Sequence, residues 1–175
     1  MTKAIDPKHD VPSTRAQIAG LPGFPVTVKH ILVPTDLSED SRKGLRYATR
    51  LARHFNARLT VLHVVDRPDV LDYLIGESLP EDPRRELQAA EQRLDSFVED
   101  LKQQHQDVDA TVVVGNVCSQ IVDLANLLES DLIVVSTHNY SWFKRLMTGS
   151  DAEKIARHAP CPILIVHQRE HDFIV

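Results

Sequence analysis

Residues 131–167 place the strongest constraint on the fold, because they carry two unbroken apolar runs on either side of an amphipathic segment. The runs Leu132–Val135 and Ile163–Val166 lack polar alternation, which is typical of strands covered on both faces of a parallel sheet. Between the runs lies a stripe at the helical spacing i, i+3, i+4 and i+7, ended by Pro160: Ala152, Ile155, Ala156 and Ala159. The segment therefore predicts a strand, a loop, a helix and a second strand.

The same alternation runs through the chain from residue 31. Apolar strands are predicted at 31–33, 59–65 and 111–114. Each is followed by a helical stripe, and the second helix is expected to begin near Asp82. The apolar residues of these stripes are Leu45, Ala48, Ala52 and Phe55; Leu87, Ala90, Leu94, Phe97, Val98 and Leu101; and Ile121, Leu124, Ala125 and Leu128. Five strands alternating with four helices predict an α/β fold, a doubly wound five-stranded parallel sheet with right-handed crossovers.

The chain length and the positions of prolines and glycines predict one domain with an additional segment at each end. The 175 residues are near the usual size of a single domain. Residues 1–27 hold four prolines and two glycines, so we expect a loosely ordered N-terminal extension. Residues 28–170 form the predicted domain, and residues 171–175 a C-terminal tail.

Composition excludes several classes of function. The net charge of −5 gives no broad basic surface for nucleic acid. No run approaches the roughly 20 apolar residues of a membrane span. The polar residues Asp6 to Asp10 do not suit a signal peptide, so we expect a cytoplasmic protein. Two cysteines are too few for a disulfide framework. His63 and His138 could meet at the sheet edge, but neither the H-x3-H nor the C-x2-C spacing of a metal site joins them, so we expect no metal there.

Two turns are the candidate ligand-binding elements. Asp36 lies after the first predicted strand, either as a turn or N-cap carboxylate or as an acceptor for a ribose or a base. Gly149 and Ser150 lie at the start of the last predicted helix, whose free backbone N–H groups suit a phosphate. Ligands of open parallel sheets bind beyond the carboxyl ends of the strands, where both turns are expected. His63, inside the second strand, is expected to be a satisfied core residue.

Three motifs carry a resemblance to a known family. They are I-L-V-P-T-D-x-S from residue 31, L-x-V-L-H-V-V-D from residue 59, and G-S-x-A-E-K-I-x-R-H-A-P-C-P-I-L-I-V from residue 149. Over about residues 28–167 the chain resembles the universal stress protein A family. The resemblance implies an adenine-nucleotide α-hydrolase-like, Rossmann-like sandwich with strand order 3-2-1-4-5, whose switch point lies between the first and fourth strands.

The resemblance also implies where a nucleotide would bind. Pro34, Thr35 and Asp36 would contact adenine and ribose, with Val64 beside the base. Gly149, Ser150 and the backbone of Asp151 would hold phosphates. Nucleotide-binding members carry G-x2-G-x9-G-[ST] after the fourth strand, and Ser136 and Asn139 stand here at the first two glycines.

The two substitutions leave alternatives open. Asn139 tolerates the left-handed backbone that a glycine adopts, and Ser136 could offer a hydroxyl donor. Trp142 could instead crowd the loop, and the Asp151 carboxylate would oppose a phosphate.

Two functions follow as expectations. The first is a cytoplasmic stress-response regulator that binds ATP or AMP, with Mg²⁺ only alongside ATP. The second is a homodimeric stress protein that binds no nucleotide and acts through protein partners. The last strand, Pro162 to His167, is an expected sheet edge, and dimerisation through it is expected in both cases. No enzyme is expected, because no nucleophile–base pair stands out and neither S-G-G-x-D-S nor H-I-G-H occurs.

Overall fold

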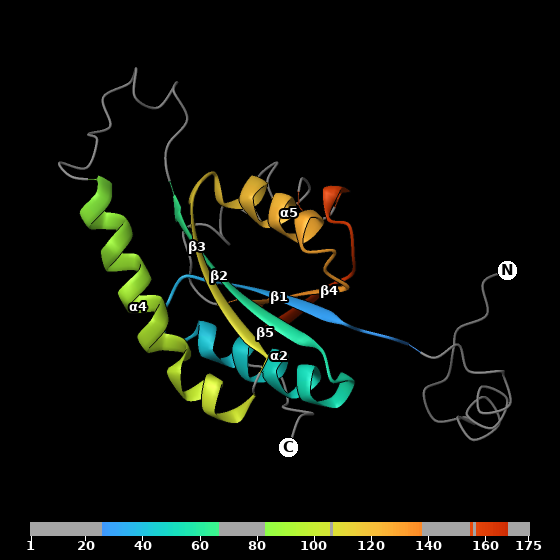
Figure 1. Ribbon diagram of the computed structural model, residues 1–175. Coiled ribbons are helices and arrows are strands. Elements are labelled where there is room, and N and C mark those ends of the chain that lie inside the picture. Colours follow the sequence, from blue (N-terminus) through green and yellow to red (C-terminus); the bar gives the residue numbers. More distant parts are fainter. Residues whose placement is uncertain (1–25, 67–82, 106, 138–154, 156, 168–175) are drawn as a thin grey trace, which may run out of the picture.

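The computed structural model describes residues 26–66, 83–105, 107–137, 155 and 157–167, and shows a parallel sheet between layers of helices (Figure 1). The strands are β1 (His30–Thr35), β2 (Arg58–Asp66), β3 (Val108–Gly115), β4 (Leu132–Thr137) and β5 (Ile163–His167). The helices are α2 (Ser41–Phe55), α4 (Pro83–Gln104) and α5 (Val117–Leu127). The sheet order is β3-β2-β1-β4-β5 with every pairing parallel, as expected.

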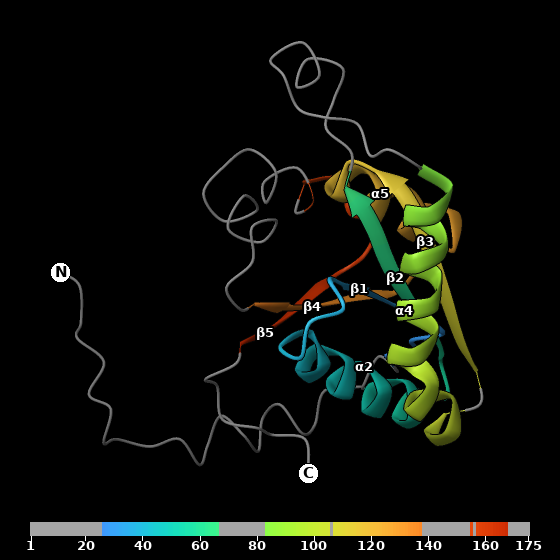
Figure 2. The ribbon, with the colours of Figure 1, turned by 90° about the vertical axis from the view of Figure 1, so that its left-hand side faces the viewer.

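Alternate residues of each strand enter two separate cores. Ile31 and Val33 of β1 pack with α2 and α4, whereas Leu32 packs with α5 on the opposite face. Figures 1 and 2 show α2 and α4 together on one face of the sheet and α5 on the other. Burial of each such side chain contributes about 1.5–3 kcal/mol, so β1 is fixed from both sides.

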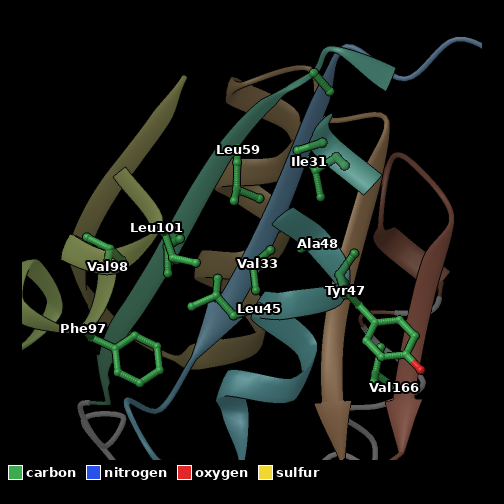
Figure 3. Close-up of a cluster of buried hydrophobic side chains, with 14 of the residues drawn as sticks. Ile31, Val33, Leu45, Tyr47, Ala48, Leu59, Phe97, Val98, Leu101 and Val166 are labelled. Atoms are coloured by element: carbon green, nitrogen blue, oxygen red, sulfur yellow. The ribbon is translucent and has the colours of Figure 1, made fainter. Parts of the chain in front are cut away.

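Figure 3 shows the first of these cores, which the helical stripes complete. Leu45, Ala48 and Ala52 of α2 are buried there, and Phe55 is half-buried against them. From α4 come Leu94, Phe97, Val98 and Leu101. The helix α2 ends at Asn56, whose left-handed φ of 54° closes the last turn and directs the chain into β2.

The third strand is longer than its apolar run indicates. It begins at Val108, three residues before the predicted Thr111, and pairs with β2 from Leu59↔Val108 onwards. Because β3 is an edge strand, Asp109 can face solvent there without breaking the ladder. A search for unbroken apolar residues therefore missed its start.

Parts of the prediction lie outside the described residues. This holds for residues 1–25 of the extension, for the tail, and for Ala152 and Ala156 of the last helical stripe. Of that stripe, Ile155 is buried in the second core and Ala159 packs against it. Within the part that the structure describes, no helix is long and apolar enough to cross a membrane.

A polar cluster ties the amino end of β1 to its neighbours. The ring of His30 is buried, with Nδ1 2.9 Å from Ser130 Oγ and Nε2 2.8 Å from Thr60 Oγ1. The carboxylate of Asp131 accepts hydrogen bonds from the backbone N–H groups of Lys29 (2.7 Å) and His30 (3.0 Å). Three elements, β1, β2 and the α5–β4 turn, are therefore joined by groups that lose water on folding.

This cluster makes stability depend on pH. Burial of the ring, and secondarily the positive charge of Arg58, lowers the pKa of His30, against an opposing effect of nearby carboxylates. The folded state thus binds fewer protons than the unfolded state. The stabilisation is complete above about pH 6.5 and is lost as the pH falls toward the lowered folded pKa.

We expect His30→Gln to flatten the dependence of the free energy of unfolding on pH between 8 and 5, because it removes this titration. The difference in slope between wild type and variant should not exceed about 1.4 kcal/mol per pH unit, the value for one proton. Urea unfolding measures it, with His54→Gln, an exposed histidine of α2, as the control. Parallel curves for wild type and His30→Gln would contradict the role given to His30.

Candidate functional site

The turn between β1 and α2 is held by its own side chains. Thr35 Oγ1 accepts from the N–H of Leu37 (3.0 Å) and shares a hydrogen bond with Ser41 Oγ (2.8 Å). Asp36 Oδ1 accepts from the N–H (3.1 Å) and the hydroxyl (2.6 Å) of Ser38. These local bonds fix the turn before any ligand is present.

Leu37 adds backbone strain to the same turn. Its φ is 63°, a left-handed conformation that costs a non-glycine residue roughly 1–2 kcal/mol. The strain is offset because the side chain packs against the first core. Strained turns held by their surroundings are common at ligand sites.

A cavity of about 110 Å³ opens beside this turn, at the carboxyl ends of β1 and β2 and the start of α5. Its described lining consists of Pro34, Thr35, Asp36, Leu62, His63, Val64, Asp66 and Val117. The structure therefore gathers four of the proposed contact residues, Pro34, Thr35, Asp36 and Val64, around one space. Leu62, Val64 and Val117 belong to the second core, so the apolar part of the cavity lies on the α5 face.

The two oxygens of the Asp36 carboxylate differ in their contacts, which bears on whether Asp36 serves the turn or accepts from a ligand. Oδ1 serves the turn, and among the described residues no group donates to Oδ2. Asp36 does not cap α2, since the N-cap position belongs to Asp40. A turn role and an acceptor role are thus compatible in one side chain.

Ser136, at the first glycine position of the motif, lies on the other face of the sheet. Its side chain is buried against Gly44 of α2, where an added Cβ would lie 3.0 Å from the Cβ and 3.2 Å from the backbone N of Ser136. The hydroxyl is therefore on the α2 face, away from Val64 and Val117. A serine here places no side chain into the apolar side of the cavity.

The remaining proposed contacts lie outside the described residues: Asn139, Gly149, Ser150 and Asp151. The structure describes β4, the strand that precedes this segment in the chain. β4 pairs directly with β1 through Ile31↔Leu132 and Leu32↔Ile133. The Pro34 turn and the segment after Thr137 therefore leave the sheet from adjacent strands, at the switch point of the doubly wound order.

His63 has more contact with the site than its sequence context indicates. It is half-buried, lines the cavity, and lies with Nδ1 2.9 Å from the main-chain oxygen of Thr35. Its position next to Val64, near the carboxyl end of a parallel strand, could have predicted that His63 lies close to the site. Among the described residues, no group of three or more His, Cys, Asp or Glu side chains could hold a metal ion.

Comparison with known proteins decides the family. The model of the universal stress protein family matches residues 27–167. The chain belongs to the universal stress protein family. A curated relative, universal stress protein MJ0531 of Methanocaldococcus jannaschii, is 27% identical over 145 residues, which cover 79% of this chain and 81% of the relative.

Two solved structures share the fold. Universal stress protein UspA of Lactobacillus plantarum has a TM-score of 0.56 and 26% identity, covering 81% of this chain and 99% of its own. A universal stress protein in complex with cAMP has a TM-score of 0.53 and 25% identity, covering 81% and 98%. These neighbours agree with the adenine-nucleotide α-hydrolase-like architecture of the sheet.

The contact between Gly44 and Ser136 gives a test of how closely α2 must approach β4. We expect Gly44→Ala to lower the free energy of unfolding, because overpacking costs about 1–3 kcal/mol and the helix preference of alanine recovers only about 1 kcal/mol. Adding Ser136→Gly should recover part of the loss by removing the Cβ at 3.0 Å. Urea unfolding of both single variants and the double variant measures the coupling, and strictly additive effects would contradict the contact.

Proposed function

We propose that this universal stress protein is a regulatory module that binds an adenine nucleotide, ATP or AMP, at the carboxyl edge of its sheet. The observation that carries the proposal is the cavity at the carboxyl ends of β1 and β2, beside the prearranged Pro34–Ser38 turn. The solved relative in complex with cAMP supports an adenylate as the ligand class.

The lining of the cavity matches the two halves of a nucleoside. Leu62, Val64 and Val117 offer apolar surface to a flat base, and Pro34 adds to it from β1. The free oxygen of Asp36 is an acceptor for a ribose hydroxyl. On this proposal the phosphates lie toward Gly149, Ser150 and the backbone of Asp151, and Mg²⁺ accompanies ATP without a protein site of its own.

We propose binding without catalysis at this site. The ionisable residues of the described lining are His63, Asp36 and Asp66. No nucleophile with a paired base occurs among these described lining residues. We therefore propose that the protein signals through its bound or empty state in the cytoplasm.

Two substitutions of Asp36 separate its turn role from its ligand role. Asp36→Asn keeps an oxygen that can accept from Ser38 but turns the free oxygen into an amide donor, whereas Asp36→Ala removes both. If Oδ2 accepts from the ribose, both variants should weaken AMP binding by about 1–3 kcal/mol in isothermal titration calorimetry. Loss with Ala alone would show that Asp36 acts only through the turn, and unchanged affinity in both would discard the role.

The second candidate is a homodimer that acts through partner proteins, and the edge strand β5 favours the dimer. Among the described strands β5 pairs with β4 alone, and Ile165 leaves 43% of its surface exposed. The ammonium of Lys43 on α2 donates to the main-chain oxygen of His167 (2.9 Å), which anchors the end of this strand. An anchored apolar edge is a surface that proteins usually cover or pair.

We expect Ile165→Asp to weaken the homodimer by about tenfold or more, because a carboxylate would be buried between the two edges. Sedimentation velocity or light scattering across micromolar concentrations measures the shift. Leu127→Asp is the matched control, since Leu127 is a large apolar residue that is 76% exposed but belongs to the helix α5 and not to the edge strand. A wild-type monomer at these concentrations would contradict the dimer.

A further inference from the structure

A second cavity, of about 580 Å³, lies at the opposite end of the sheet from the candidate nucleotide site. Residues at the amino ends of β1 and β2 and in the turn between α5 and β4 form its wall. The rise of about 3.3 Å per residue along β1, from His30 to Thr35, separates the two cavities by roughly 17 Å. A ligand in the second cavity would therefore not compete with a nucleotide in the first.

Charges of both signs line this second cavity. The cations are Lys29 and Arg58, and the carboxylates are Asp107, Glu129 and Asp131. A ligand with only negative or only positive charge would meet like charges in the wall as well as opposite ones. The lining is therefore complementary to a ligand that carries an ammonium and a carboxylate together.

The carboxylate of Asp131 is a fixed acceptor in the cavity wall. Its Oδ2 accepts from the backbone N–H groups of Lys29 (2.7 Å) and His30 (3.0 Å), and the side chain is half-buried. Among the described residues no group donates to Oδ1, and none pairs with the neighbouring carboxylate of Glu129. An acceptor already held by the backbone loses little freedom when it binds an ammonium group.

The guanidinium of Arg58 is the matching donor. Its Nε lies 3.5 Å from Asp107 Oδ1, in a pair whose side chains are 57% and 61% exposed. Such an exposed pair contributes little, so it does not hold the arginine against a better partner. The two terminal nitrogens have no acceptor among the described residues, and they suit bidentate binding of a carboxylate.

Arg58 and Asp131 lie level with each other across the sheet. His30 of β1 is in register with Arg58 of β2, and on its other side the backbone N–H of Asp131 donates to the main-chain oxygen of His30 (2.9 Å). Two strand spacings of about 4.8 Å therefore separate the backbones of Arg58 and Asp131 by roughly 10 Å. An extended chain spans about 3.3–3.6 Å per residue, so a ligand of about three residues matches this distance and a single amino acid does not.

We propose that this cavity binds a short peptide of about three residues with both of its ends free. The terminal ammonium donates to Oδ1 of Asp131, with Glu129 beside it, and the terminal carboxylate accepts from the guanidinium of Arg58. Lys29, on the strand between them, adds positive charge on the carboxylate side. This inference does not rest on the proposed nucleotide site.

The test uses three peptides of equal length: trialanine, its N-acetyl form and its C-terminal amide. Each is titrated into the full ¹⁵N-labelled chain and followed by the backbone amide signals of Lys29, Arg58 and Asp131. Trialanine should shift these signals with a roughly millimolar dissociation constant, as expected for a ligand of so few atoms. Each blocked form should bind about tenfold more weakly, the scale of one charge-assisted hydrogen bond. Saturating AMP should leave the affinity for trialanine unchanged.

Variants assign the two ends of the peptide. Arg58→Gln should lose the preference for trialanine over the amide and keep the preference over the N-acetyl form. Asp131→Asn should do the reverse. Because Asp131 also holds β1, Glu129→Gln, which breaks no described hydrogen bond, provides a second variant that should reduce the same preference. Arg93→Gln, an exposed arginine of α4 outside the described lining, is the control and should bind as wild type.

Several results would overturn the inference. They are the absence of any shift at tens of millimolar trialanine, equal binding of trialanine and either blocked form, and displacement of trialanine by AMP. Wild-type preferences in both Arg58→Gln and Glu129→Gln would also overturn it. A chain that binds trialanine as expected but binds no AMP would overturn the proposed function and leave this inference standing.

Discussion

The burial of β1 on both faces is the constraint on which the rest of the structure depends. All six of its residues are buried, and β2 and β4 pair with it on either side. Its amino end is tied down by His30, Ser130 and Thr60, and its carboxyl end opens into the turn that lines the cavity. A strand held in this way cannot shift its register without moving apolar side chains to the wrong core. The position of the candidate site is therefore set by packing far from it.

The turn after β1 shows how local chemistry prepares a site. Hydrogen bonds that the side chains of Thr35 and Asp36 accept from the backbone hold a conformation in which Leu37 is strained, so the polar atoms at the cavity wall are in place before binding. A ligand meeting such a wall loses less free energy to ordering than one that must organise the turn. These contacts use Oδ1 of Asp36 and leave its Oδ2 without a donor among the described residues.

Much of the fold could be predicted from the periodicity of apolar residues, but the sheet order could not. The stripe Leu45, Ala48, Ala52 predicts a helix packed on a sheet, and the structure buries all three. Nothing in that spacing says that β1 lies between β2 and β4; the order came from the resemblance to universal stress proteins and is confirmed. The early start of β3 was missed because an edge strand is defined by its hydrogen bonds to β2 and tolerates Asp109.

The site could be predicted only in part, for related reasons. Ser136 could have been assigned to the α2 face from strand alternation, because it shares the parity of Val134, which lies in the first core. The contact of His63 with Thr35 could not be predicted, since sequence alone does not reveal that its ring reaches the main-chain oxygen of Thr35. Motif comparison identified Pro34, Thr35, Asp36 and Val64 as one group, and the fold brings them to one cavity.

The central claim is that the cavity at the end of β1 is the base and ribose pocket of an adenylate. The most direct measurement is a crystal structure of the full chain grown with saturating AMP. The base should lie against Val64 and Val117, with a ribose hydroxyl on Asp36 Oδ2. Density for AMP elsewhere on the molecule, or a cavity without nucleotide at saturating AMP, would contradict the claim.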